Sequence, residues 1–238
     1  MNIEETKKIT LSLINTFKKA SEISLMLRNA GLKKKIKKDN TPVTNGDIEV
    51  NNILVKKISE VTPNIRIVSE ENTTNKKNHN LKDFWLIDPI DGTKEYINNR
   101  DEFTINAALI LNKKPIIGIV SAPGKKRIFY SYARSHSYEL NNKKDIKLIN
   151  NKKNNNQIKA VSYSDELRPD IFKIHQNYNV KFHQKMKSSL KFCVVAAGEF
   201  DLYVAEARAC EWDIAAGHAI VENSGGKITD FEGNDIVY

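Results

Sequence analysis

Two carboxylates lie three residues apart in the stretch 84–95, on either side of a proline. The apolar residues before Asp88 predict a buried strand that ends at this carboxylate, and Pro89 restricts the turn that follows. Such a turn can direct Asp88 and Asp91 to one point, with the backbone carbonyl of Ile90 as a further oxygen. Because hard divalent cations prefer oxygen ligands, the stretch predicts a cation site.

Gly92 and Thr93 follow directly and begin a predicted short helix. The N–H groups at a helix N-terminus favour an anion such as phosphate. A plain alternative is an Asp-Pro turn with Thr93 as the N-cap residue, which would account for either aspartate alone. The run as a whole, together with the acids described next, favours a cation site beside a phosphate-binding turn.

Three more acids stand at the ends of predicted elements. Glu70 follows the alternating strand 65–69, and Asp213 falls in the first turn of a helix, where a carboxylate also suits the helix dipole. Asp47 is the third position of a cap that begins at Thr44, so a capping box is its plain alternative role. Acids gathered around a cleft repel one another unless cations neutralise them. Oxygen-only ligands favour Mg²⁺, Mn²⁺ or Ca²⁺ over zinc.

Phosphate ester hydrolysis suits this set of acids. One general acid or base contributes ~10²–10⁴-fold, whereas phosphate monoester hydrolysis needs up to ~10²¹-fold acceleration. Two metal ions ~3.5–4 Å apart can supply the difference by activating water and neutralising the leaving oxygen. A glycosidase is the competing use of paired acids, and it would set two carboxyl groups ~5–5.5 or ~6.5–9.5 Å apart along a sugar groove. Four acids beside a helix N-terminus favour phosphate.

The elements that must position these residues form two halves. The predicted helices lie at 3–30, 45–60, 165–178, 190–197 and 212–224, and the predicted strands at 65–69, 84–88, 103–111, 115–122, 127–132, 137–140, 145–149, 158–163, 180–185 and 200–205. Antiparallel strands followed by strand–helix alternation predict an α/β fold, an α+β layered sandwich with two subdomains. We expect subdomain 1–150 to hold the metal and phosphate site. Subdomain 151–238 would add substrate contacts and one metal ligand, with the boundary in the tract 151–156.

The bulk composition is that of a globular chain. Of 238 residues, 40% are hydrophobic and 28% charged, and no apolar run approaches the ~20 residues of a membrane helix. The polar N-terminus does not resemble a secretory signal, and Cys193 and Cys210 are too few for a disulfide scaffold, so a cytoplasmic setting is expected. The net charge of +9 suits an anionic substrate. Basic and aromatic residues do not interleave, so no nucleic-acid partner is expected. The lysine run 33–38, by default a solvated connector, leaves peripheral association with an anionic inner membrane as an alternative.

Taken together, these motifs resemble those of the lithium-sensitive, magnesium-dependent phosphatases that include inositol monophosphatase. The matching runs are Asp-Pro-hydrophobic-Asp-Gly-Thr at 88–93, Glu-Glu at 70–71, Trp-Asp-x-Ala-Ala-Gly at 212–217, Pro-Val-Thr…Asp at 42–47 and Gly-Gly at 225–226. The runs 91–96, 102–106 and 188–193 resemble the 3′(2′),5′-bisphosphate nucleotidases of the CysQ type. The resemblance implies the inositol monophosphatase and fructose-1,6-bisphosphatase-like fold. It also implies hydrolysis of 3′-phosphoadenosine 5′-phosphate to AMP and phosphate, within sulfur assimilation.

The resemblance also assigns roles to individual residues. It implies two or three Mg²⁺ ions with Mn²⁺ as a substitute, inhibition by Li⁺, a nucleoside bisphosphate as the substrate, and a homodimer as the common assembly. The implied metal ligands are Glu70, Asp88, Ile90 through its carbonyl, Asp91 and Asp213. The implied catalytic residues are Asp47, Glu70 and Thr93, with Asp47 and Thr93 orienting the attacking water. The implied substrate-binding residues are Glu70, Ile90, Asp91, Gly92, Thr93, Ser188, Lys191 and Asp213.

Several alternatives stand beside this hypothesis. The same scaffold would suit an inositol monophosphatase or another sugar-phosphate phosphatase, and a basic anion-binding protein is the non-enzyme alternative. Lys191 could be an ordinary solvated lysine at the start of a helix. The chain departs from the nucleotidase pattern at 162–165, at 204–205 and at Lys187, which stands where glycine commonly precedes Ser-Ser. These departures concern substrate contacts and leave the metal acids unchanged.

Overall fold

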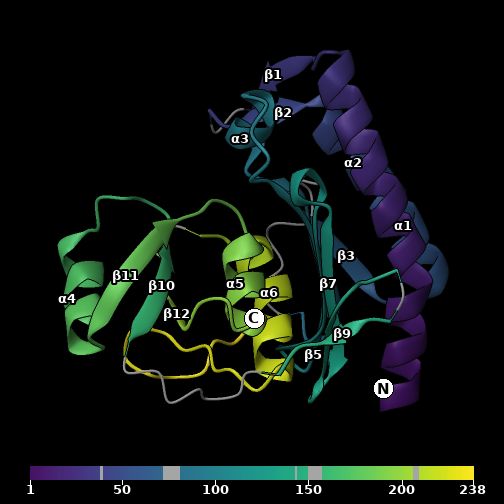
Figure 1. Cartoon of the computed structure of the whole chain (residues 1–238). Coiled ribbons are helices and arrows are strands. Elements are labelled where there is room, and N and C mark those ends of the chain that lie inside the picture. The colour runs from purple at the N-terminus through teal and green to yellow at the C-terminus, as the bar shows by residue number, and fades with distance from the viewer. Residues whose placement is uncertain (38–39, 72–80, 143, 150–156, 206–208) are drawn as a thin grey trace.

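The computed structural model has alternating layers of helices and sheets, which Figure 1 shows from the side. It describes residues 1–37, 40–71, 81–142, 144–149, 157–205 and 209–238. Helices α1 (Ile3–Ala30) and α2 (Asn45–Val61) cover one face of a large sheet, and α5 (Leu190–Ala196) and α6 (Glu211–Asn223) lie on its other side. A small sheet and α4 (Pro169–Asn177) follow beyond α5. The layered α/β fold expected from the sequence is confirmed.

The large sheet has seven strands in the described part of the chain, in the order β3-β4-β5-β6-β7-β8-β9. Strands β3 and β4 pair in parallel and the other neighbours are antiparallel. Their bounds are β3 Arg66–Ser69, β4 Phe84–Asp91, β5 Thr104–Leu111, β6 Lys114–Ala122, β7 Arg127–Ala133, β8 His136–Glu139 and β9 Ile146–Lys147. The predicted antiparallel meander is therefore present, and the parallel pair β3 and β4 beside it brings Glu70 and Asp88 to one end of the sheet.

The apolar pattern predicted that the strand ends at Asp88, but β4 continues to Asp91. Its register with β5 breaks after Asp88, which pairs with Asn106, and resumes at Asp91, which pairs with Thr104. Pro89 lies inside this irregularity, where a missing N–H costs no ladder hydrogen bond. Such a break locally bends a strand, and both aspartates lie at the same end of β4.

Alternate residues of β4 bury their side chains on opposite faces of the sheet. Trp85 and Ile87 pack with α1 and α2, while Phe84 and Leu86 pack with α5 and α6. This alternation explains why the stretch before Asp88 is apolar without interruption. The strand is covered by helices on both faces of the sheet, so the side chains on both faces are buried.

The N-terminal segment follows its sequence cues closely. Helix α1 begins with a capping box between Asn2 and Glu5, and α2 begins with one between Thr44 and Asp47. The run 33–38 was expected to be a solvated connector. It instead contributes the exposed strand β1 (Lys34–Ile36), which pairs with β2 (Pro42–Thr44), because the extended segment before α2 offers it a partner.

The second half contains a parallel sheet, in the described residues of the order β11-β10-β12, with β10 at Ile158–Ser162, β11 at Val180–Lys185 and β12 at Leu202–Tyr203. The helix predicted at 165–178 begins only at Pro169, a residue favoured in the first helical turn. The strand predicted at 200–205 is reduced to the two residues of β12. The tract 151–156 lies outside the described residues, so the division into 1–150 and 151–238 stays a prediction.

Among the described helices, none combines the length and the apolar character needed to cross a bilayer.

Candidate active site

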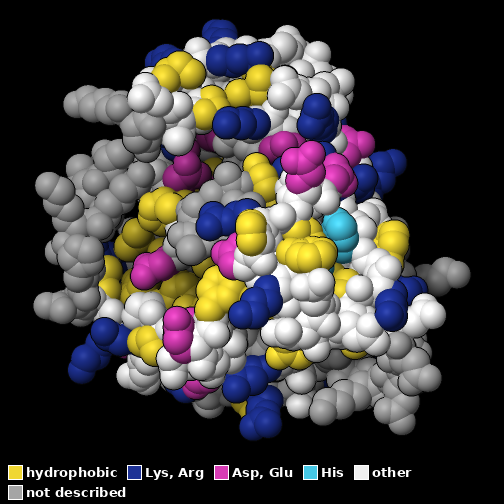
Figure 2. Space-filling view, turned by 90° about the vertical axis from the view of Figure 1, so that its left-hand side faces the viewer, with side chains coloured by type: hydrophobic (Ala, Val, Ile, Leu, Met, Phe, Trp, Pro, Cys, Tyr) yellow, Lys and Arg dark blue, Asp and Glu magenta, His cyan; other side chains and the backbone are white. Residues whose placement is uncertain are grey.

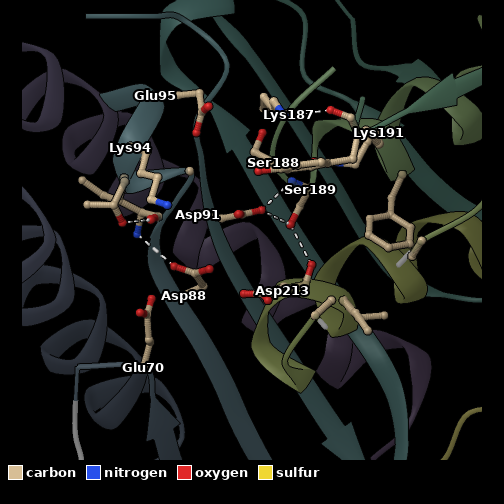
Figure 3. A pocket seen from close by; sticks show the side chains of 18 of the residues that line it. Glu70, Asp88, Asp91, Lys94, Glu95, Lys187, Ser188, Ser189, Lys191 and Asp213 are labelled. Carbon is tan, nitrogen blue, oxygen red and sulfur yellow. Dashed lines mark hydrogen bonds between the residues drawn. The ribbon is translucent and has the colours of Figure 1, made fainter. Parts of the chain in front are cut away.

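Three carboxylates from two distant parts of the chain meet at one end of the large sheet. Asp88 and Asp91 come from β4, and Asp213 comes from the first turn of α6. One oxygen of each lies within 4.8 Å of an oxygen of the other two, and the three side chains face a common space in Figure 3. They line a cavity of about 320 Å³ that also contains Glu70. The sequence thus correctly predicted that acids far apart in the chain converge.

Electrostatics shows how unfavourable this cluster is by itself. Burial, with repulsion from Glu70, Asp91 and Asp213, raises the pKa of Asp88 well above its ordinary value. Burial and the nearby Asp91 likewise raise the pKa of Asp213 to about 6. Buried like charges of this kind are relieved either by protonation or by a compensating cation. The oxygen-only donor set fits a hard divalent ion such as Mg²⁺.

Glu70 is held by a cation from the chain itself. The Lys37 ammonium donates to a carboxylate oxygen of Glu70 at 2.8 Å and to one of Glu71 at 2.6 Å. The Lys37 and Glu71 side chains are only 15% and 6% exposed, so these contacts are shielded from water. This role of Lys37 was not predicted from the sequence, because Lys37 belongs to a run of similar lysines and nothing local marks which one turns inward.

Asp47 serves the helix cap and the cavity at the same time. One oxygen, Oδ2, accepts hydrogen bonds from the Thr44 amide at 2.8 Å and from the Thr44 hydroxyl. The other oxygen, Oδ1, lies 3.3 Å from the Thr93 hydroxyl, which is also 3.1 Å from the Ile90 carbonyl. Burial raises the pKa of Asp47, against the hydrogen bonds from Thr44 that lower it. The capping and catalytic hypotheses for Asp47 are therefore compatible.

The turn after Asp91 requires a glycine. Gly92 has φ of 89°, in the left-handed region, and an added Cβ would lie 3.1 Å from the Glu102 carbonyl. Helix α3 (Thr93–Ile97) starts immediately afterwards, as predicted, so the amides of its first turn have no partners within the helix.

The opposite wall of the cavity carries Ser188, Ser189 and two lysines (Figure 3). Lys191 is 4% exposed, and its ammonium donates to the Ser188 carbonyl and lies 5.2 Å from the centre of the Tyr203 ring. Burial lowers the pKa of Lys191 to about 8. The alternative of a solvated lysine at a helix start is therefore wrong for Lys191.

Two residues of this wall were not among the predicted site residues. Lys187 places its ammonium 3.1 Å from the centre of the Tyr163 ring and 2.7 Å from the Tyr163 carbonyl. Ser189 contacts the Asp91 carboxylate through its amide at 2.5 Å and its hydroxyl at 2.6 Å. Only Ser188 of the Ser-Ser pair was predicted as a site residue. Both serines suit a helix start, so the local sequence does not show which of them contacts Asp91.

Comparison with known proteins assigns this arrangement to a family. A model described as the inositol monophosphatase family matches residues 5–238. The chain belongs to the inositol monophosphatase family. The CysQ 3′(2′),5′-bisphosphate nucleotidase of Buchnera aphidicola subsp. Acyrthosiphon pisum is 37% identical over 212 residues, covering 85% of this chain and 76% of that relative.

Solved structures agree with this family membership. CysQ from Bacteroides thetaiotaomicron matches with a TM-score of 0.67 and 26% identity, over 94% of this chain and 86% of that one. A protein described as an IMPase/NADP phosphatase complexed with Mg²⁺ and phosphate matches with a TM-score of 0.81 over 99% of this chain and 87% of its own. Its 18% identity supports the shared fold alone.

Proposed function

We propose that this protein is a Mg²⁺-dependent 3′(2′),5′-bisphosphate nucleotidase that hydrolyses 3′-phosphoadenosine 5′-phosphate to AMP and phosphate. The observation that carries the proposal is one cavity lined both by the acidic cluster and by a buried lysine. The carboxylates suit a cation-assisted phosphoryl site, and Lys191 suits a second anionic group on the same substrate. Similarity to CysQ 3′(2′),5′-bisphosphate nucleotidases supports this substrate class.

The metal ligands in this proposal are Glu70, Asp88, Asp91 and Asp213, with the carbonyl of Ile90. When bound, two or three Mg²⁺ ions, or Mn²⁺ in their place, would neutralise the phosphoryl oxygens and lower the pKa of a nearby water. The raised pKa values of Asp88 and Asp213 support a cation at this position. Inhibition by Li⁺ is an additional expectation from the family.

The remaining chemistry belongs to the protein's own groups. The amides of Gly92 and Thr93 would bind the phosphoryl oxygens at the start of α3. Asp47 would accept a hydrogen bond from the Thr93 hydroxyl, whose oxygen then accepts from the attacking water and orients it. Glu70 lines the same cavity and would complete the catalytic group. Ser188 and Lys191 would hold the phosphate that is not cleaved.

Phosphate release measured with equal concentrations of two esters tests this assignment. We expect 3′-phosphoadenosine 5′-phosphate to be hydrolysed with a higher kcat/KM than inositol 1-phosphate, because only the bisphosphate carries a second anion for Lys191. A higher kcat/KM for inositol 1-phosphate would instead establish the inositol or sugar-phosphate alternative. No hydrolysis of either ester with Mg²⁺ or Mn²⁺ would favour the non-enzyme alternative, a basic anion-binding protein.

The setting of the enzyme is part of the proposal. A cytoplasmic location is supported by Cys193 and Cys210, both of which are free thiols. Figure 2 shows lysine and arginine side chains spread among other residues over one face rather than gathered in a patch, which supports a small anionic substrate over a nucleic acid. Peripheral membrane association through the run 33–38 and a homodimer stay predictions. Vesicle co-sedimentation at two salt concentrations and light scattering would test them.

A further inference from the structure

Ser189 occupies a junction between the two metal-binding segments. It directly precedes α5, is 2% exposed, and lies between Asp91 of β4 and Asp213 of α6 in Figure 3. Its backbone N–H donates to Asp91 Oδ2 at 2.5 Å, and its hydroxyl lies 2.6 Å from the same oxygen. The hydroxyl is also 2.7 Å from the backbone carbonyl of Asp213. One side chain therefore contacts two of the acidic segments.

The hydrogen-bond roles at Ser189 are nearly fixed by its partners. The Asn106 side-chain amide donates to the Ser189 hydroxyl oxygen at 3.0 Å, so this oxygen accepts one bond. The single hydroxyl proton then goes either to Asp91 Oδ2 or to the Asp213 carbonyl. Because bonds to a charged acceptor are stronger, Asp91 is the favoured acceptor while its carboxylate is ionised. The Asp91 carboxylate is thus held by two donors from one residue.

This arrangement is not explained by a role for Ser189 in capping α5. Serine before a helix commonly accepts a hydrogen bond from an amide of the first turn. The Ser189 side chain makes no such capping bond, and its backbone angles, φ −67° and ψ −5°, are helical rather than those of a usual N-cap residue. The hydroxyl is instead directed at Asp91.

We propose that Ser189 is a positioning residue that orients the Asp91 carboxylate and the start of α6 for the divalent cation. The inference deepens the proposed function and rests on its metal dependence, but not on the identity of the phosphate ester. Groups that hydrogen-bond to metal-ligating carboxylates typically contribute 10- to 100-fold to metal affinity. Ser189→Ala keeps the backbone N–H bond to Asp91, so we expect a loss near the lower end of that range.

The test is isothermal titration of the metal-free protein with Mn²⁺. We expect the Kd of Ser189→Ala to be raised about 10-fold. Ser137→Ala is the matched control, because Ser137 is equally buried and its hydroxyl donates to the Ile220 carbonyl of α6 at 3.1 Å, away from the acids. The control should keep its Kd within about two-fold of the parent. A Ser189→Ala Kd within two-fold of the parent, or an equal rise in Ser137→Ala, would overturn the proposal.

Two further variants separate positioning from general structural damage. Ser189→Thr retains the hydroxyl and should restore most of the Mn²⁺ affinity; a Kd as high as that of Ser189→Ala would count against the inference. If Ser189→Ala does not fold by circular dichroism, Ser189→Cys, with a weaker donor of similar size, takes its place under the same two-fold criterion.

Kinetics provides a second readout. In Ser189→Ala, the Mg²⁺ concentration for half-maximal hydrolysis should rise about as much as the Mn²⁺ Kd, whereas kcat at saturating Mg²⁺ should stay within a few-fold of the parent. A fall in kcat at unchanged metal dependence would refute positioning of a metal ligand. If neither phosphate ester is hydrolysed, the proposed function fails while the Mn²⁺ titration still decides the role of Ser189.

Discussion

Lys191 should reduce the stability of the protein at neutral pH, and Lys191→Met should reveal this. Its side chain is 4% exposed, and burial lowers its pKa from 10.5 to about 8. At about 1.4 kcal/mol for each unit of pKa, keeping this ammonium charged in the folded state costs about 3 kcal/mol. Methionine has a similar length and no charge, so it removes this cost. It also removes the hydrogen bond to the Ser188 carbonyl, which costs about 1–3 kcal/mol at every pH.

The pH dependence separates these two effects. The unfolded chain keeps the Lys191 proton up to a pH of about 10.5, whereas the folded protein releases it near pH 8. Between these values the unfolded state binds more protons, so the unfolding free energy of the parent rises with pH. The free-energy cost of losing the hydrogen bond to the Ser188 carbonyl does not vary with pH. It therefore cancels when the difference between the parent and Lys191→Met is compared at two pH values. Relative to Lys191→Met, the parent should therefore gain about 3 kcal/mol between pH 7 and pH 10.5.

Urea denaturation in EDTA at several pH values measures this difference. Lys173→Met, which removes an exposed lysine of α4, is the control, and its curve should run parallel to that of the parent. A constant difference between the parent and Lys191→Met from pH 7 to pH 10.5 would refute the reasoning. The same variant should raise KM about 10- to 100-fold for 3′-phosphoadenosine 5′-phosphate, since one charged hydrogen bond is lost. KM for adenosine 3′-phosphate should change little.

Three other predictions follow from the acid cluster. Asp91→Asn should lower phosphate release about 10³-fold, because a metal ion supplies several kcal/mol of charge stabilisation and each ~1.4 kcal/mol is about tenfold in rate; normal turnover would disprove the catalytic assignment. The same variant should raise the Tm of the metal-free protein, because one of several repelling carboxylates is removed. Mg²⁺ at 100 times its Kd should add about 2.7 kcal/mol to the unfolding free energy in calorimetry, reversed by EDTA. Mn²⁺ affinity should fall below about pH 6, where protons compete for Asp213; an affinity independent of pH from 5 to 7 would contradict this.

Features set by neighbouring residues were predictable from the sequence. The capping box of Thr44 and Asp47, the irregularity at Pro89 and the helix that starts after Gly92 all depend on interactions within a few residues. Such contacts are encoded by residue type and spacing, so pattern and propensity find them. The convergence of Asp213 with Asp88 spans more of the chain. It was expected because several acids around a cleft would be costly without a shared cation, and because the run 212–217 resembles a family motif.

Features that depend on the packing of distant segments were not predictable in this way. Lys37 contacts Glu70 across 33 residues, and Ser189 contacts Asp91 across 98. In both cases the neighbouring sequence offers equivalent candidates, several lysines in one and two serines in the other. Only the fold decides which ammonium or hydroxyl reaches the carboxylate, because that depends on the register of β1 with β2 and on the position of α5.

Two glycines, one on β6 and one on α6, allow the close packing that positions Asp213. A Cβ added to Gly118 of β6 would lie 2.3 Å from the Ala216 carbonyl, and one added to Gly217 would lie 2.4 Å from the Phe192 ring. The backbone of helix α6 is therefore in close contact with β6 of the large sheet on one side and with the Phe192 side chain of α5 on the other. Asp213 is about one turn before Gly217, and Ser189 is three residues before Phe192. The packing that joins the two helices to the sheet thus also brings Ser189 and Asp213 to the end of the sheet where Asp88 and Asp91 of β4 lie.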